Sequence, residues 1–318
     1  MIPGQICDLK LGEDYRQLDL HGSHLFPCVC FNVDVTRNVG REVPWHWHEE
    51  IEVIAVVEGR GFVRCGGESW VLEEGEGVFI NANTLHSVQL VEGGFCRLHS
   101  LVFSADLLAG VPGSVFDQRY LRPLLRSSCQ AVALGRDKPW QREAVAAQEG
   151  AYRAYAGEKF GWELQVRSEL SQLWSLVAEH TSPTERRAED GADTARLKAM
   201  LEYLHGNYDR PVSLEDVAEA ANVSKRECLR CFQRTIGVTP IQYLQRFRIR
   251  EASALLGETE LPITEVGGRC GFESPSYFAL LFRRHTGQTP REYRRELRAK
   301  GPPLASLSSL GYTDTEQN

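Results

Sequence analysis

The chain has 318 residues, 42% of them apolar, and a formal net charge of −7 at pH 7. This length allows two domains with packed cores, and no run of about eighteen apolar residues predicts a transmembrane helix. The nine cysteines lack the spacing of a secreted disulfide framework and the polar N-terminus is not that of a signal peptide, so we expect reduced thiols in a cytoplasm.

The N-terminal third has the pattern of antiparallel β-structure. Residues 1–25 are uninformative, but from Phe26 to Phe103 short apolar runs alternate with turn residues. Strands at such spacing predict a sandwich or a barrel. The predicted strands are Cys28–Val35, Glu52–Val57, Gly61–Cys65, Ser69–Leu72, Gly77–Ile80, His86–Leu90 and Arg97–Phe103.

From about Gln118 the apolar period becomes helical. In Phe160–Thr181 a regular apolar stripe predicts a dimer contact, with packing onto the chain's own barrel as the alternative. The stripe consists of Trp162, Val166, Leu170, Leu173, Trp174 and Val177. Residues 182–193 are polar and without periodicity, which predicts a linker, and the polar tail 301–318 is predicted to be disordered.

The C-terminal part contains an internal repeat. Residues 224–243 and 274–293 are identical at seven of twenty positions when aligned at an offset of 50. Each copy begins with an N-cap serine, ends its helix at a glycine, and continues into a Thr-Pro capping box. Short amphipathic segments, Ser213–Ala221 and Ile263–Cys270, precede the two copies. The sequence therefore predicts two helix-turn-helix units joined by one helix from Pro240 to about Leu256.

The charge distribution fits a nucleic-acid partner for this part. Residues 194–300 hold 18 Lys+Arg against 13 Asp+Glu, whereas the remainder holds 18 against 30. A basic module on an acidic chain suits a polyanion, because phosphate contacts supply most sequence-independent affinity. Cys228 and Cys231 occupy apolar helix positions and are predicted to be a buried pair, not a redox switch.

The repeat resembles the DNA-binding domain of the AraC/XylS family of bacterial transcription regulators. The resemblance covers roughly residues 195–298 and is carried by Pro262–Phe272, Ser276–Phe278, Phe282 and Gly287–Pro290. It implies that the second helix of each unit enters a major groove, with the two grooves about one turn apart on the DNA. Arg226 and Arg230 are the strongest candidates for reading bases, since arginine can contact guanine with two hydrogen bonds.

The DNA-contacting residues follow from the exposed positions of the two reading helices. In the second helix, Ala279 and Leu280 predict apolar contact to thymine methyl groups or positioning through nearby arginines. The expected set is Ser224, Lys225, Arg226, Leu229, Arg230, Arg234, Ser274, Pro275, Ser276, Ala279, Leu280, Arg283 and Arg284.

A second pattern lies in the strand segment. Because strand side chains alternate, His46, His48 and Glu52 are expected to point the same way, with Trp45 and Trp47 packing on the opposite side. The spacing of these residues, followed by His86, resembles the cupin motifs, although Asn81, Asn83 and Leu90 depart from the second motif. The resemblance implies that His86 joins the other three. Together they could form a ligand pocket, a mutual hydrogen-bond network at its mouth, or a site for divalent iron, manganese, nickel or zinc.

These observations predict an α+β two-domain protein. Residues 1–181 are expected to form a cupin-like antiparallel β-barrel that binds an effector and dimerises, and residues 194–300 an all-α tandem helix-turn-helix domain. We expect a ligand-responsive transcription regulator, an activator rather than a repressor, and not an enzyme. Its expected partners are double-stranded DNA, a small-molecule effector such as a sugar, a second copy of the chain and RNA polymerase; no cofactor is required. The alternative is a metal-dependent cupin enzyme with an appended DNA-binding domain.

Overall fold

A computed structural model describes residues 9, 11, 16–18, 21–23, 25–111, 113–181 and 188–300, the side chains of 188–194 and 298–300 excepted. Two compact units divide at Leu244 and Gln245, inside one helix, and each is described by itself. The predicted linker begins in residues outside the described ones, but its last six residues, 188–193, are helical. The predicted tail 301–318 also lies outside the described residues.

The first unit begins with an antiparallel barrel. In the described part of the chain its strands are β1 (Cys28–Asp34), β2 (Glu42–His46), β3 (Ile51–Cys65), β4 (Glu68–Glu73), β5 (Gly77–Ile80), β6 (His86–Leu90), β7 (Cys96–Phe103) and β8 (Ala131–Leu134). One layer has the order β1-β7-β3-β5-β8, and a second consists of β4 and β6 on the other half of β3 with β2 on β6. The predicted antiparallel architecture is confirmed.

The structure has one continuous strand, β3, where the sequence predicted a turn at Gly59. The segment 58–61 was expected to separate two strands, but the chain continues through it with only a register shift next to Glu58. A Cβ atom on Gly59 would lie 2.0 Å from the Phe95 carbonyl oxygen. Glycine is needed there because its φ of 77° is left-handed and the Phe95 carbonyl, just before β7, approaches closely, and not because the chain reverses. Strand β8 was not predicted, since it has no long alternating pattern, and β2 was expected only as part of one strand that carried Trp45 to Glu52.

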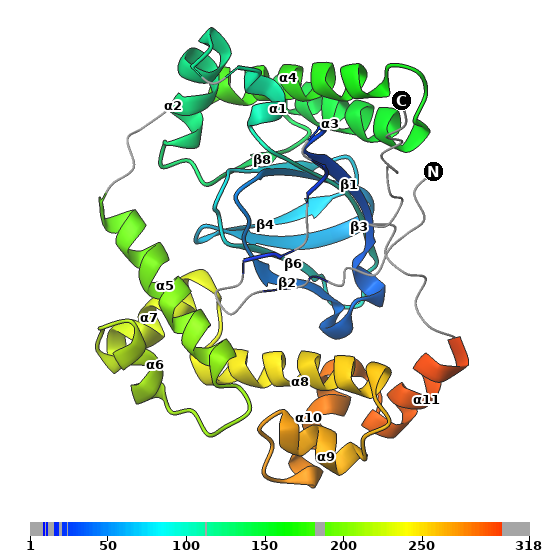
Figure 1. Ribbon diagram of the computed structural model, residues 1–318, viewed down its shortest axis with the longest axis vertical. Coiled ribbons are helices and arrows are strands. Elements are labelled where there is room, and N and C mark those ends of the chain that lie inside the picture. Colours follow the sequence, from blue (N-terminus) through cyan, green and yellow to red (C-terminus); the bar gives the residue numbers. More distant parts are fainter. Residues whose placement is uncertain are drawn as a thin grey trace, which may run out of the picture. The chain divides into compact units, whose positions relative to one another are not determined.

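Alternate side chains along β3 belong to two different hydrophobic cores. Ile51, Val53 and Ala55 face a core shared with the helices, whereas Ile54 and Val56 face the barrel interior. The helices are α1 (Asp106–Ala109), α2 (Arg122–Leu125), α3 (Pro139–Gly157) and α4 (Trp162–His180), with a π-helical turn at Phe116–Leu121 before α2. Figure 1 shows α3 and α4 lying together along one side of the barrel. Glu52 lies two residues before Ile54 on β3, so its side chain is on the same face of the strand and points into the barrel interior.

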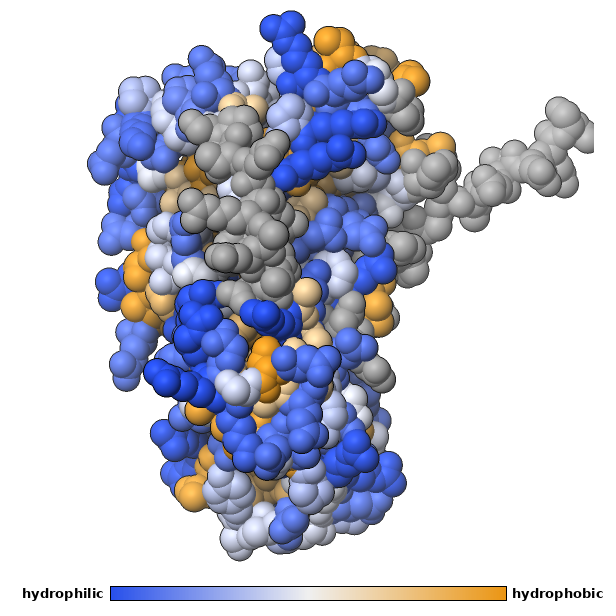
Figure 2. Space-filling model, turned by 90° about the vertical axis from the view of Figure 1, so that its left-hand side faces the viewer, coloured by the Kyte–Doolittle hydropathy of each residue, from blue (hydrophilic) through white to orange (hydrophobic). Residues whose placement is uncertain are grey.

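The apolar stripe of α4 packs within its own domain. Val166, Leu170, Leu173, Trp174 and Val177 are all buried in the core that the helices share with the barrel. The proposal that this stripe forms a dimer contact is therefore wrong for these residues. Its regularity reflects packing on α3 and the sheet. Exposed apolar side chains nearby, such as Leu164, are separate from the stripe, and hydrophobic surface in Figure 2 forms small patches among hydrophilic residues.

The first helix-turn-helix completes the first unit. It comprises α5 (Ala188–Gly206), α6 (Leu214–Ala220), α7 (Lys225–Thr235) and the start of α8 (Pro240–Glu258). Ser213 and Asp216 form a capping box at the start of α6. The core includes Val217, Phe232 and the predicted pair of buried cysteines, Cys228 and Cys231. No described helix has the length and hydrophobicity needed to cross a membrane.

The second unit repeats this arrangement with α9 (Ile263–Arg269), α10 (Pro275–Thr286) and α11 (Pro290–Lys300). Asn222 and Gly271 take the left-handed conformation at equivalent points of the two turns, with φ angles of 53° and 74°. Both turns close by matching backbone hydrogen bonds from Val223 and Phe272. The second turn is one residue longer than the first, because Val223 and Phe272 are 49 residues apart whereas the cap residues Ser224 and Ser274 are 50 apart. The extra residue is therefore Glu273.

Candidate functional site

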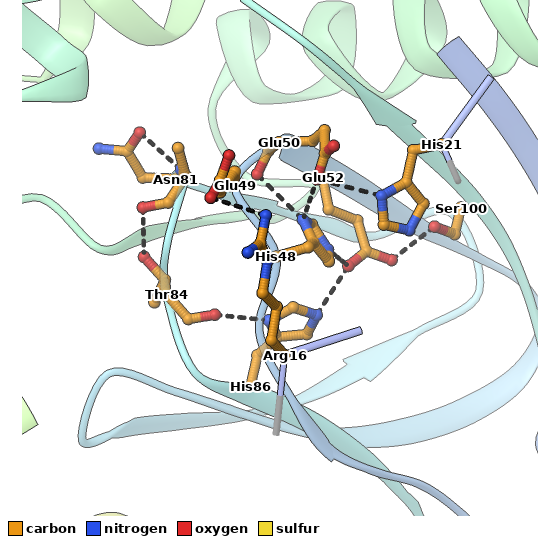
Figure 3. A network of polar contacts seen from close by, with 11 residues as sticks. Arg16, His21, His48, Glu49, Glu50, Glu52, Asn81, Thr84, His86 and Ser100 are labelled. Carbon is orange, nitrogen blue, oxygen red and sulfur yellow. Dashed lines mark hydrogen bonds and ion pairs between the residues drawn. The ribbon is translucent and has the colours of Figure 1, made fainter. Parts of the chain in front are cut away.

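The four polar residues predicted for the barrel meet in its interior. His46 ends β2, His86 begins β6 and Glu52 lies on β3, so the cluster joins both layers of the barrel. Figure 3 shows His48 and His86 pointing toward Glu52. All four side chains are buried, at 4% exposure for His46, 3% for His48, 6% for Glu52 and 1% for His86. Their ligand atoms all lie within 4.8 Å of one another. The predicted convergence is present.

The backbone geometry that brings these side chains together differs from the predicted one. His46, His48 and Glu52 were expected on one face of one strand, but β2 ends at His46 and β3 begins only at Ile51. The chain bends through residues 47–50, and this bend turns His48 toward Glu52. Trp45 and Trp47 are both buried, in keeping with the predicted packing role.

Glu52 is the centre of the cluster. Its Oε2 lies 2.7 Å from His86 Nε2 and 3.3 Å from His48 Nε2, and its Oε1 accepts a 2.5 Å hydrogen bond from the Ser100 hydroxyl. Burial alone would raise the pKa of Glu52, but His86 and His48 beside it hold that pKa well below its usual value. The carboxylate is therefore ionised in the barrel interior.

The two histidines on the β2 side of the cluster have depressed basicity. Burial lowers the pKa of His46 well below its usual value, and the positive charge that His86 can carry lowers it further. Burial also lowers the pKa of His48, against the opposing effect of Glu52. Both rings are consequently neutral near pH 7, which is the protonation state that binds a metal ion or accepts a hydrogen bond.

Two of the three departures from the second cupin motif, Asn81 and Asn83, have structural explanations. Asn81 donates from its amide nitrogen to the carbonyl oxygens of Leu124 and Cys129, both at 2.9 Å, and so fixes the segment that precedes β8. Asn83 has a φ of 61°, a left-handed conformation that asparagine tolerates in place of glycine. Its backbone N–H donates to the His48 carbonyl at 2.8 Å. These substitutions therefore maintain the loop that carries His48 and His86.

Sequence reasoning missed three residues of this network. Ser100 lies on β7, and His21 and Glu50 form a 3.0 Å contact between His21 Nδ1 and a Glu50 carboxylate oxygen. Figure 3 shows His21 near Glu52 and His48. Ser100 lies two residues after Leu98 on β7, and Leu98 faces the barrel interior. The alternation of side chains along a strand could therefore have predicted that Ser100 also faces the interior. His21 lies in a segment without any periodic pattern and offered none.

The predicted DNA-contacting residues divide between the two reading helices. In α7, Ser224, Lys225, Arg226, Leu229, Arg230 and Arg234 are solvent-exposed. In α10, Ser274, Pro275, Ser276, Leu280, Arg283 and Arg284 are exposed, and Ala279 is half-buried. Each helix thus presents one continuous exposed face, while Phe232, Phe278 and Phe282 are buried on the other side.

Several of these residues have partners within the protein. Ser224 and Ser274 cap their helices by accepting from the backbone N–H of Glu227 and Tyr277. Arg230 donates to both carboxylate oxygens of Glu227, at 2.8 Å from Nε and 2.5 Å from one Nη. Glu227 was not predicted as part of the site, although its position three residues before Arg230 on one helix face is a recognisable signal.

Comparison with known proteins agrees with both parts of the chain. A family model described as an AraC-like ligand binding domain matches residues 36–173, and one described as a helix-turn-helix domain matches residues 217–296. The chain is 27% identical to the uncharacterized HTH-type transcriptional regulator YdeC of Bacillus subtilis, over 90% of this chain and 97% of that protein.

Two further relatives have named regulatory roles. The HTH-type transcriptional activator RhaR of Cronobacter sakazakii is 26% identical over 79% of this chain and 86% of its own length. The melibiose operon regulatory protein of Escherichia coli is 26% identical over 79% of this chain and 83% of its own length. In all three, the similarity covers more of this chain than either family model does alone.

Proposed function

Because the chain belongs to the AraC family of transcriptional regulators, with a ligand-binding and a DNA-binding domain, we propose that it activates transcription in response to a small molecule bound in its barrel. The observation that carries this proposal is the pairing of two reading helices, each with one buried and one exposed face. The exposed face of α7 is basic, which suits a DNA phosphate backbone. Relatives named as regulators support a role without catalysis.

We assign the effector site to His46, His48, Glu52 and His86. Buried polar groups need partners, and four that converge in a domain interior supply hydrogen-bonding or coordinating atoms to a ligand. The name of the melibiose operon relative supports a sugar as the effector class. A homodimer, contact with RNA polymerase and a cytoplasmic location complete the proposal, since an activator must act where the DNA and the polymerase are.

The proposal is tested with the full-length chain. Selection from a random DNA pool should yield one preferred sequence, and binding to it should weaken steeply with salt, because lysine and arginine contacts displace counterions. Each monomer should protect two successive major grooves, about 10–10.5 base pairs apart. Absence of any preferred sequence would remove the proposed function, and protection of a single groove would mean that one unit is only structural.

The sensing role is tested separately. Small molecules that raise the thermal stability of the chain identify effector candidates, because a ligand that binds only the folded state stabilises it. An effector bound at the four-residue cluster should alter DNA affinity in the unchanged chain and have no effect on the His48→Ala variant. A normal response in that variant would place the effector elsewhere.

A further inference from the structure

The two reading helices, α7 and α10, have the same pattern of buried positions. At the offset of 50 that relates the two copies of the repeat, three buried residues of α7 fall on buried residues of α10. These pairs are Cys228 with Phe278, Cys231 with Leu281, and Phe232 with Phe282. Both helices also begin after a serine cap that accepts a hydrogen bond from the backbone N–H three residues later. A residue on the exposed face of α7 therefore has a direct equivalent on the exposed face of α10.

The chemistry at these equivalent exposed positions differs. The equivalent of Arg230 in α10 is Leu280, and the equivalent of Arg226 is Ser276. The side chain of Arg230 is 57% exposed and Leu280 is 65% exposed, whereas Ala279 beside it is half-buried. The position that carries a two-pronged hydrogen-bond donor in the first unit therefore carries a branched hydrocarbon in the second.

The residue that precedes this position by three also differs. In α7 it is Glu227, whose carboxylate accepts two hydrogen bonds from Arg230. In α10 it is Tyr277, whose hydroxyl accepts a 2.9 Å hydrogen bond from Gln245 of α8. Residues three apart are neighbours on a helix surface, so Leu280 lies beside an aromatic ring and not beside a carboxylate. The second unit thus lacks the acceptor that orients the arginine of the first.

The surroundings of Leu280 indicate what can cover it. An exposed leucine is ordinary on a protein surface and indicates nothing by itself. Arg283 and Arg284, three and four residues later, are also exposed and continue the same side of α10 with positive charge. Phosphates suit these arginines, and the second helix of a helix-turn-helix unit is the one that enters the major groove. Charge and position together favour DNA over an apolar protein surface as the occupant of this face.

The major groove offers a leucine one apolar feature, the C5-methyl group of thymine. Leucine has no donor or acceptor and cannot distinguish the hydrogen-bonding edges of the bases, whereas contact with a methyl group removes apolar surface from water. We propose that Leu280 recognises the C5-methyl group of a thymine, at the position in its groove equivalent to the base that Arg230 contacts in the other. This inference rests on the proposed function and names the DNA that the two helices select. One half of the preferred sequence then contains a guanine for α7, and the other contains a thymine for α10.

Removal of a single methyl group from the DNA tests this contact. In the sequence selected by the full-length chain, each thymine is replaced in turn by deoxyuridine, which keeps every hydrogen-bonding group of thymine and lacks the methyl. One replacement should weaken binding about fourfold, as expected for one methyl group that is no longer buried. The Leu280→Ala variant should bind the thymine and deoxyuridine sequences equally. Leu229→Ala, the same change in α7, is the matched control and should retain the difference at that base pair.

Two further substitutions test recognition of the methyl group by a gain of binding. 5-Methylcytosine carries the same C5-methyl group, so at that position it should bind about fourfold more tightly than cytosine in the unchanged chain and equally in Leu280→Ala. Leu280→Arg gives the second unit the side chain of the first, and it should change the preferred base from thymine to guanine at this position. Because Leu280 is exposed, thermal unfolding of both variants should match that of the unchanged chain.

The outcomes separate this inference from the proposed function. If the chain selects a DNA sequence but no deoxyuridine replacement weakens binding, the methyl contact is wrong and the proposed function stands. The same loss in the unchanged chain and in Leu280→Ala would assign the methyl group to another residue and overturn the role of Leu280. Failure to select any sequence would remove the proposed function and this inference together.

Discussion

At the scale of single residues, Arg230, the proposed base-reading side chain, is held by a partner on its own helix. Its guanidinium donates twice to the Glu227 carboxylate on the same helix face. The pair is exposed, so it contributes little to stability. It does restrict the arginine to one direction, and contact with guanine would require the guanidinium to leave or share that carboxylate.

Arg230→Ala should cost about 1–3 kcal/mol of specific binding and relax the preference at one base pair. Glu227→Gln should increase affinity for all DNA, because it removes a negative charge near the phosphates, and should reduce the preference at the same base pair. Competition binding with single-base variants of the selected sequence measures both effects. Glu265→Gln is the control, since Glu265 pairs with Arg269 on α9, outside the reading helices. An equal loss on every sequence for Arg230→Ala would mean that Arg230 contacts phosphate.

At the scale of elements, the two helix-turn-helix units differ where their helices cross. A Cβ atom on Gly267 of α9 would lie 2.8 Å from Phe278 Cδ1 of α10, whereas one on Gly268 would meet nothing within 4 Å. In the first unit the corresponding residue is Ala218, which is buried. The close approach of α9 to Phe278 therefore requires glycine at only one of two adjacent positions.

Gly267→Ala should destabilise the second unit by about 1–3 kcal/mol, because the added methyl group overpacks the contact with Phe278. Gly268→Ala should be neutral or stabilising by up to about 1 kcal/mol, because alanine favours the helix. Thermal unfolding of the full-length chain compares the two variants. Equal effects from both would show that helix propensity, and not the contact with Phe278, decides the role of Gly267.

At the scale of the whole molecule, the buried and exposed sides of α4 allow the stability of the domain and the self-association of the chain to be tested separately. Leu170 is fully buried in the core that α4 shares with the barrel, while Leu164 on the same helix is 74% exposed. A dimer contact through this helix would have to use its exposed side. The two leucines therefore offer a matched pair of substitutions.

Leu170→Ala should lower the free energy of unfolding by about 2–5 kcal/mol through the cavity that it leaves. Leu164→Ala should change stability by less than about 0.5 kcal/mol. If the exposed side of α4 joins two chains, Leu164→Ala should weaken the dimer in sedimentation equilibrium at constant folded fraction. Unchanged association in that variant would assign the dimer contact to another surface.

The sequence alone determined the family, the antiparallel strands and the paired helix-turn-helix units, because these depend on local signals. Cap residues, terminal glycines and apolar periods act over a few positions, and they placed Ser224, Ser274, Gly237 and Gly287 as the structure has them. The four polar residues of the barrel were also found together, through motif spacing.

Only the tertiary structure decided how those residues meet and which surface the α4 stripe covers. The bend after β2 and the contribution of Ser100 depend on contacts between distant segments. An apolar stripe has the same pattern whether it packs on its own barrel or on another chain, since burial lowers the free energy in the same way in both cases. Only the position of α3 and the sheet distinguishes the two.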